Sequence, residues 1–220
     1  MAQTRSATIY PRLQQEARVR QPLYSPAEYL ALEREASYKS EYINGQIYAM
    51  AGTSRRHNLI GGNFYRLIGQ QFVGRACEAY VSEMRVKVSP TGMYTYPDVA
   101  AACGELRFED GYIDTLLNPS VIVEVLSPST EAYDRGEKFA HYRRLDSLME
   151  YVLVSQDKVR VEHYTRQAGG WLLTEISDLD GVLRLASIDC SVRLRDIYDK
   201  VQFEDEASLG DAGSSASVDA

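Results

Sequence analysis

Two carboxylates stand in apolar runs of the sequence, where an unpaired charge would be costly. Asp98 opens the run "DVAAAC", and Glu124 lies in the middle of "VIVEVL", 26 residues further along the chain. A buried carboxylate needs an ion pair, hydrogen bonds or a metal ion. If the two runs are neighbouring strands, both acids can share an oxygen-ligand site for Mg²⁺ or Mn²⁺ with a backbone carbonyl and waters. Such a site serves phosphodiester hydrolysis.

Each acid also has a structural interpretation. Asp98 could cap a turn at the start of its strand, because Pro97 fixes the chain before it. For Glu124 this alternative is weaker, since a glutamate in an otherwise apolar strand still needs a partner. The pattern therefore favours metal binding more strongly for Glu124 than for Asp98.

The bulk composition predicts one globular domain. The chain has 220 residues, 45% of them hydrophobic, and we expect a flexible arm over 1–21, a single domain over 22–202 and a disordered acidic tail over 203–220. The net charge is −7, with +3 in residues 1–20 and −5 in residues 203–220. The folded part is therefore mildly acidic, and any face that binds phosphate has to be local.

The cysteines and the hydropathy pattern point to a cytoplasmic protein without membrane segments. Cys77, Cys103 and Cys190 are scattered and odd in number, so we expect a reducing compartment, no disulfide framework and no zinc site. No apolar stretch is long enough to span a bilayer, and no signal-peptide core follows Met1. With three histidines and no HxxxH spacing, any metal should be a hard cation bound by carboxylates.

The elements that must position the two acids are readable along the chain. Ser25, Pro26 and Glu28 form a capping box that begins a helix, and Asn44-Gly45 is a type I′ hairpin signal. The remaining pattern predicts helices from 53 to about 72 and over 131–147, and strands near 79–89, 96–103, 120–127 and 149–155. After these we expect an antiparallel meander and a short terminal helix. Helices on a centrally buried sheet predict an α/β domain.

Several of these segments together resemble a known family. "YPDV", "VEVLSPST", "YDRGEKFAHYRRL" and "EYVLV", with the earlier "SEYINGQIYAMAG", "SRRHNLI" and "VSEMRVKV", resemble the Uma-two family of restriction-endonuclease-like proteins, within the PD-(D/E)xK nuclease superfamily. The resemblance covers roughly residues 22–200. It implies a restriction-endonuclease-like core, a mixed central β-sheet flanked by helices, with an N-terminal helix and β-hairpin and a C-terminal antiparallel extension.

The resemblance also implies roles for particular residues. Asp98 matches the Asp of the PD element and Glu124 matches the (D/E) position, so both are expected metal ligands. The lysine expected two residues after Glu124 is replaced by Leu126. Lys138, on the following helix, is the candidate to replace it, and Glu41 is preferred over Glu83 as a further catalytic acid.

Lys138 has a structural alternative of about equal weight, because Asp134 and Lys138 are spaced as an ordinary i,i+4 ion pair. Tyr142 lies about 40° from Lys138 on an α-helix and is a candidate substrate-binding residue. Arg56 and His57 are candidates for phosphate contacts. Arg56 could instead be simply solvated, and for His57, near a helix start, a structural role is the favoured interpretation.

The leading hypothesis is a Mg²⁺-dependent (or Mn²⁺-dependent) nuclease that hydrolyses phosphodiester bonds, most readily in DNA, and works as a homodimer. The alternative is a nuclease-fold module without activity that binds nucleic acid or a protein partner. Leu126 and the acidic net charge support this alternative.

Overall fold

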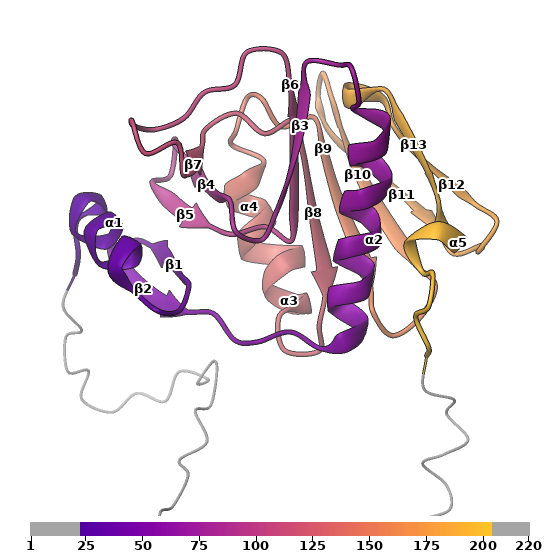
Figure 1. Ribbon diagram of the computed structural model, residues 1–220, viewed down its shortest axis with the longest axis horizontal. Coiled ribbons are helices and arrows are strands. Elements are labelled where there is room, and N and C mark those ends of the chain that lie inside the picture. The colour runs from indigo at the N-terminus through magenta and orange to yellow at the C-terminus, as the bar shows by residue number, and fades with distance from the viewer. Residues whose placement is uncertain (1–22, 204–220) are drawn as a thin grey trace, which may run out of the picture.

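The computed structural model describes residues 23–203 (Figure 1). The predicted arm over 1–21 and all but the first residue of the predicted acidic tail lie outside this range. No helix within residues 23–203 has both the length and the apolar character needed to cross a membrane.

A six-stranded mixed sheet forms the centre of the fold, as the α/β pattern predicted. Its strand order is β11-β10-β9-β8-β6-β3, and β8 and β9 are parallel while the other neighbours are antiparallel. The strands are β3 (Cys77–Val81), β6 (Val99–Cys103), β8 (Val121–Leu126), β9 (Glu150–Ser155), β10 (Val161–Gln167) and β11 (Gly170–Ile176). β8 and β9 are buried along their whole length, which explains their nearly continuous apolar sequences.

Helix α2 (Arg55–Gln71) covers one face of this sheet (Figure 1). Ser54 caps its N-terminus, and Ile60, Phe64 and Ile68 recur at helical spacing and are buried. They pack against the odd-numbered residues of β8 and against the C-terminal elements β12 (Val182–Leu185), η2 (Ala186–Ile188), β13 (Cys190–Arg193) and α5 (Leu194–Ile197). The expected meander and short terminal helix are confirmed.

The other face of the sheet is covered by a helical segment in three parts: α3 (Glu131–Tyr133), the π-helical turn η1 (Asp134–Lys138) and α4 (Phe139–Tyr142). The even-numbered residues Ile122 and Leu126 of β8 face this layer. The segment ends five residues earlier than predicted. The guanidinium of Arg166 donates to the carbonyl oxygens of Arg143 and Leu145, so it satisfies groups that a continuing helix would have paired.

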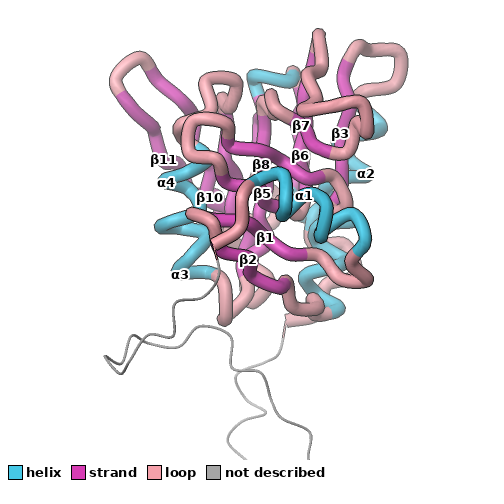
Figure 2. The backbone as a smooth tube through the Cα atoms, turned by 90° about the vertical axis from the view of Figure 1, so that its left-hand side faces the viewer, coloured by secondary structure: helices cyan, strands magenta, loops and turns pink. Residues whose placement is uncertain are grey.

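A second sheet lies beside the first and has the order β2-β1-β5-β4-β7. It comprises β1 (Ser40–Ile43), β2 (Gln46–Ala49), β4 (Arg85–Val88), β5 (Met93–Thr95) and β7 (Thr115–Leu116). Figure 2 shows its β1–β2 hairpin and helix α1 (Pro26–Glu35) on the side of the molecule that is left in Figure 1. The predicted capping box is present, and Asn44 and Gly45 both have positive φ (51° and 84°), as a type I′ turn requires.

Two further expectations from the sequence are wrong. The single strand predicted over 79–89 is two strands, β3 and β4, which belong to different sheets and are separated by a turn closed by Met84 N–H and the Val81 carbonyl. Cys77 and Cys103, expected to be free thiols, form a disulfide. They are opposite one another in the antiparallel β3–β6 pair, an adjacency that sequence spacing does not reveal.

Candidate active site

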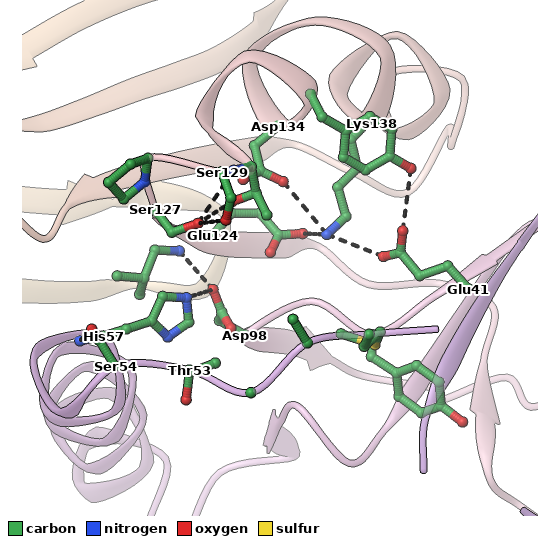
Figure 3. Close-up of a pocket in the computed structure, with 18 of the residues that line it drawn as sticks. Glu41, Thr53, Ser54, His57, Asp98, Glu124, Ser127, Ser129, Asp134 and Lys138 are labelled. Atoms are coloured by element: carbon green, nitrogen blue, oxygen red, sulfur yellow. Dashed lines mark hydrogen bonds and ion pairs between the residues drawn. The ribbon is translucent and has the colours of Figure 1, made fainter. Parts of the chain in front are cut away.

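A cavity of about 350 Å³ opens between the two sheets, and it gathers most of the residues singled out in the sequence (Figure 3). Glu41 comes from β1, Glu124 from β8, and Asp134 and Lys138 from the π-helical turn. Asp98 stands one residue before β6. The other lining residues are Tyr48–Ser54, His57, Tyr96, Val125, Ser127–Thr130, Tyr133 and Gln156.

Asp98 and Glu124 meet because β6 and β8 are antiparallel neighbours. Val99 is opposite Val123, so Asp98, one residue before β6, lies near Glu124 of β8, and both residues line the cavity. The Asp98 Oδ2 atom accepts a hydrogen bond from the Val125 N–H (2.7 Å). The pairing of β6 with β8 thus brings both carboxylates to one cavity.

Glu124 is more deeply buried than Asp98, with 3% of its surface exposed. Its Oε1 atom lies 3.0 Å from Lys138 Nζ and accepts a hydrogen bond from the Tyr142 hydroxyl (2.9 Å). Burial raises the pKa of Glu124 well above its ordinary value, and the nearby charge of Asp98 raises it further, whereas Lys138 acts in the opposite direction.

Lys138 is the centre of the site. Its ammonium lies 3.0 Å from Glu124, 3.3 Å from Glu41 and 3.6 Å from Asp134. Burial alone would lower the pKa of Lys138, but attraction to Glu124 and then to Glu41 raises it well above its ordinary value. The Lys138 side chain is therefore protonated at neutral pH, and the surrounding carboxylates fix its position. Its pair with Asp134 is buried and is the longest of the three contacts, so the ordinary surface ion pair does not describe this residue.

The π-helical turn explains how one short helix presents so many groups to Glu124. A π turn contains more residues than an α turn and is often found at functional sites. Asp134, Lys138 and Tyr142 lie at intervals of four, and all three turn toward the β8 side of the helix. The Tyr151 hydroxyl donates to the Asp134 carbonyl (3.0 Å), so a side chain from β9 supports the turn.

Glu41 completes the surroundings of the lysine. It accepts hydrogen bonds from the Thr95 hydroxyl and from the Tyr133 hydroxyl (3.2 Å). Glu83, the alternative considered from the sequence, has a largely exposed side chain that pairs with Lys39 at 2.7 Å. The structure thus places Glu41, not Glu83, beside Lys138.

Asp134 was not among the predicted site residues, although it lines the cavity and is 3% exposed. Burial raises its pKa, while Lys138 lowers it. The signal in the sequence was the i,i+4 spacing from Lys138, which had an ordinary surface ion pair as an alternative explanation of about equal weight.

The three predicted substrate-binding residues lie in different places. His57 lines the cavity, with its Nε2 atom 3.2 Å from Asp98 Oδ2. Arg56 is outside the lining and lies 3.6 Å from Asp157. Tyr142 is fully buried behind Glu124 and does not line the cavity. This position does not suit a substrate contact, so we reassign Tyr142 as a residue that positions Glu124.

The donor atoms of Asp98 and Glu124 fit a hard cation. Within residues 23–203, the protein contacts of Glu124 go to Oε1 and those of Asp98 to Oδ2, which leaves one oxygen of each carboxylate for another ligand. Oxygen ligands with retained waters are what Mg²⁺ prefers. No group of three or more His, Cys, Asp or Glu side chains in the described part is arranged to hold a metal ion. The fit therefore rests on these two carboxylates.

The mixed sheet, the helices on its two faces and the acids on adjacent strands define a restriction-endonuclease-like fold. A crystal structure described as "a putative nuclease belonging to DUF820" from Anabaena variabilis ATCC 29413 superposes with a TM-score of 0.66, at 20% sequence identity, over 79% of this chain and 96% of that one. At this identity the likeness establishes the fold.

The chain belongs to the Uma2 family, whose model is described as "Putative restriction endonuclease" and matches residues 26–194. It is also similar to two proteins of Synechocystis sp. (strain ATCC 27184 / PCC 6803 / Kazusa). The chain is 41% identical to "Uncharacterized protein sll1609" over 155 residues, which is 70% of this chain and 88% of that protein. It is 38% identical to "Uncharacterized protein slr1290" over 183 residues, 83% and 95% respectively. The resemblance seen in the sequence is thereby confirmed.

Proposed function

We propose that this protein is a nuclease that hydrolyses phosphodiester bonds in DNA with the help of Mg²⁺ or Mn²⁺. One observation carries the proposal: Lys138 Nζ lies 3.0 Å from Glu124 in the cavity that also contains Asp98. A nuclease of this superfamily needs two acids and a lysine together, and here the lysine comes from the helix instead of position 126.

Asp98 and Glu124 would hold the cation, through the oxygen of each that the protein leaves without a partner. When bound, such an ion lowers the pKa of a coordinated water and offsets charge on the phosphate. The backbone N–H of Val125 and the Tyr142 hydroxyl orient the two carboxylates. Their fixed geometry is what a preorganised hard-cation site requires.

Lys138 would stabilise the negative charge that develops on the phosphate oxygens. Its raised pKa keeps it protonated, so it suits the role of a fixed cation and not that of a general base. Glu41 and Asp134 hold the ammonium from two further sides.

The test is cleavage of plasmid and single-stranded DNA by the purified protein with Mg²⁺ or Mn²⁺. We expect the wild-type protein to cut and Glu124→Gln to lose activity by about a hundredfold or more. Glu137→Gln is the matched control, because Glu137 lies on the same helical segment but is exposed. Equal cleavage by the wild type and Glu124→Gln would trace the activity to a contaminant and contradict the assignment.

Thermal unfolding separates the proposal from the alternative of an inactive module. A ligand at 100 times its Kd stabilises the folded state by about 2.7 kcal/mol. We expect Mg²⁺ to raise the Tm of the wild type and of Glu137→Gln but not of Glu124→Gln. No cleavage together with no Glu124-dependent shift would favour a module without activity.

A further inference from the structure

The segment between β2 and α2 passes along the cavity and closes one side of it. Seven consecutive residues, 48–54, line the cavity, while Ala51–Ser54 are exposed on their outer side. We call Met50–Ser54 the strap. Figure 3 shows it passing beside His57 and Asp98, with Thr53 and Ser54 labelled.

The strap is held by hydrogen bonds at its two ends. The Met50 N–H donates to the Lys39 carbonyl (2.9 Å), and the Ser54 hydroxyl donates to Gln156 Oε1 (2.7 Å) across the cavity. Between these ties, residues 51–53 make no hydrogen bond with another residue of the range 23–203. The contact between Ser54 and Gln156 joins the strap to the end of β9.

The reacting groups lie inside this enclosure. Glu124 is 3% exposed, and the side chain of Asp98 is 18% exposed. The strap and the first turn of α2 form one wall, and the Ser127–Thr130 turn forms another. A cavity of about 350 Å³ lies near the lower end of the range of about 300–1,000 Å³ found for small-ligand pockets. Because Glu124 is almost fully buried, a scissile phosphate reaches it only if its backbone enters the cavity, which a flexible unpaired strand can do more readily than a paired, stacked duplex.

The lining contains the groups that a single strand would use. Three tyrosines line the cavity. Tyr96 and Tyr133 donate their hydroxyls to Glu33 and Glu41, whereas Tyr48 donates to Gln46 on the surface and is 43% exposed. Bases stack on exposed aromatic rings without regard to sequence. Outside the lining, the strap leads directly into Arg55 and Arg56 at the start of α2. Arg56 lies beside Asp157, and the exposed Arg55 suits an anionic backbone.

From these features we infer that the substrate is a single-stranded nucleic-acid segment, which lies under the strap with its phosphate at Asp98 and Glu124 and a base against Tyr48. We expect an intact duplex to enter the cavity less readily than a single strand. This inference rests on the proposed nuclease function, and it names the substrate class of that site.

Binding tests the inference without requiring cleavage. Fluorescence anisotropy with Mn²⁺ would compare a short phosphorothioate single strand, which resists hydrolysis, with the matching blunt duplex. We expect the wild-type protein to bind the single strand at least about tenfold more tightly. Tyr48→Ala should weaken that binding about fivefold or more, the loss of one stacked base, and Tyr48→Phe should restore it. Tyr65→Ala is the control, because Tyr65 on α2 is similarly exposed (39%) but outside the cavity.

A Gly-Ser-Gly-Ser insertion after Gly52 lengthens the strap where a side chain would meet open space. The insertion should let the duplex enter more readily and so reduce the difference in affinity between the single strand and the duplex. Equal or tighter duplex binding by the wild type would overturn the inference even if the protein cuts DNA. Conversely, a retained preference for single strands without metal-dependent cleavage of any DNA would contradict the hydrolytic function and leave this inference standing.

Discussion

Lys138 and Glu124 lie 3.0 Å apart although they are separated by fourteen residues of sequence, a turn and a π-helical segment. In the superfamily pattern the lysine stands two residues after the acid, on the same strand. Here Leu126 takes that position and packs into the core on the same face as Glu124, and the helical segment that covers this face supplies the ammonium.

Replacing this lysine should reduce both activity and stability. In Lys138→Met, three buried carboxylates lose their shared cation, which we expect to cost about 3–5 kcal/mol of unfolding free energy, and cleavage should fall about a hundredfold or more. Urea unfolding and the rate of DNA cleavage by the folded protein measure these effects. Lys158→Met, at an exposed position, should change neither. Wild-type cleavage by a folded Lys138→Met protein would remove the lysine from the mechanism.

Tyr142→Phe should act on turnover without weakening substrate binding. The change deletes the hydroxyl that donates to Glu124 but keeps the buried ring, so about 1 kcal/mol of stability should be lost. Because Tyr142 does not line the cavity, we expect kcat to fall and KM for DNA to stay constant. Tyr198→Phe removes another buried hydroxyl, which donates to the Ser155 carbonyl, and should lower stability alone. A rise in KM with unchanged kcat would point instead to a substrate contact.

Acid should destabilise the fold through Glu150. This carboxylate is 1% exposed, and its oxygens lie 2.6 Å from His163 Nε2 and 2.7 Å from the Ser187 N–H. Burial raises its pKa, but the hydrogen bonds from His163 and Ser187 together outweigh burial and lower it below its ordinary value.

The folded state therefore holds the Glu150 proton more weakly than the unfolded state, where the pKa is about 4.3. Its contribution to stability is complete above that pH and is lost as the pH falls through the lower folded value. Denaturant midpoints between pH 7 and pH 3 should fall less steeply for Glu150→Gln than for the wild type. Glu175→Gln, exposed on β11, should follow the wild type. Parallel curves for all three proteins would refute the assignment.

The oxidised protein should contain one disulfide. Alkylation in denaturant without reductant should label one of the three cysteines, Cys190, and all three after reduction. Because 26 residues separate the bridged positions, Cys77→Ser should lower the free energy of unfolding by about 3 kcal/mol. Cys190→Ser, which leaves the bridge intact, is the control. Three reactive thiols in oxidised protein would show that the bridge does not form.

The local sequence determined most of the elements and the identity of the two strand acids. Capping residues, the Asn44-Gly45 turn and the apolar period of α2 are decided by neighbours along the chain, so they can be recognised there. A charge inside an apolar strand is equally visible, because burial without a partner is costly. These signals placed Asp98 and Glu124 on strands, and the family resemblance suggested Lys138.

The tertiary structure decided what those residues meet. The pairing of β6 with both β3 and β8 brings Cys77 to Cys103 and Asp98 to Glu124, and it depends on registers between segments that are distant in sequence. The division of residues 79–89 between two sheets, the π-helical turn that adds Asp134 and the burial of Tyr142 depend on packing from both sides. Local sequence propensity does not predict such contacts, because their stability comes from packing between segments that are distant in sequence.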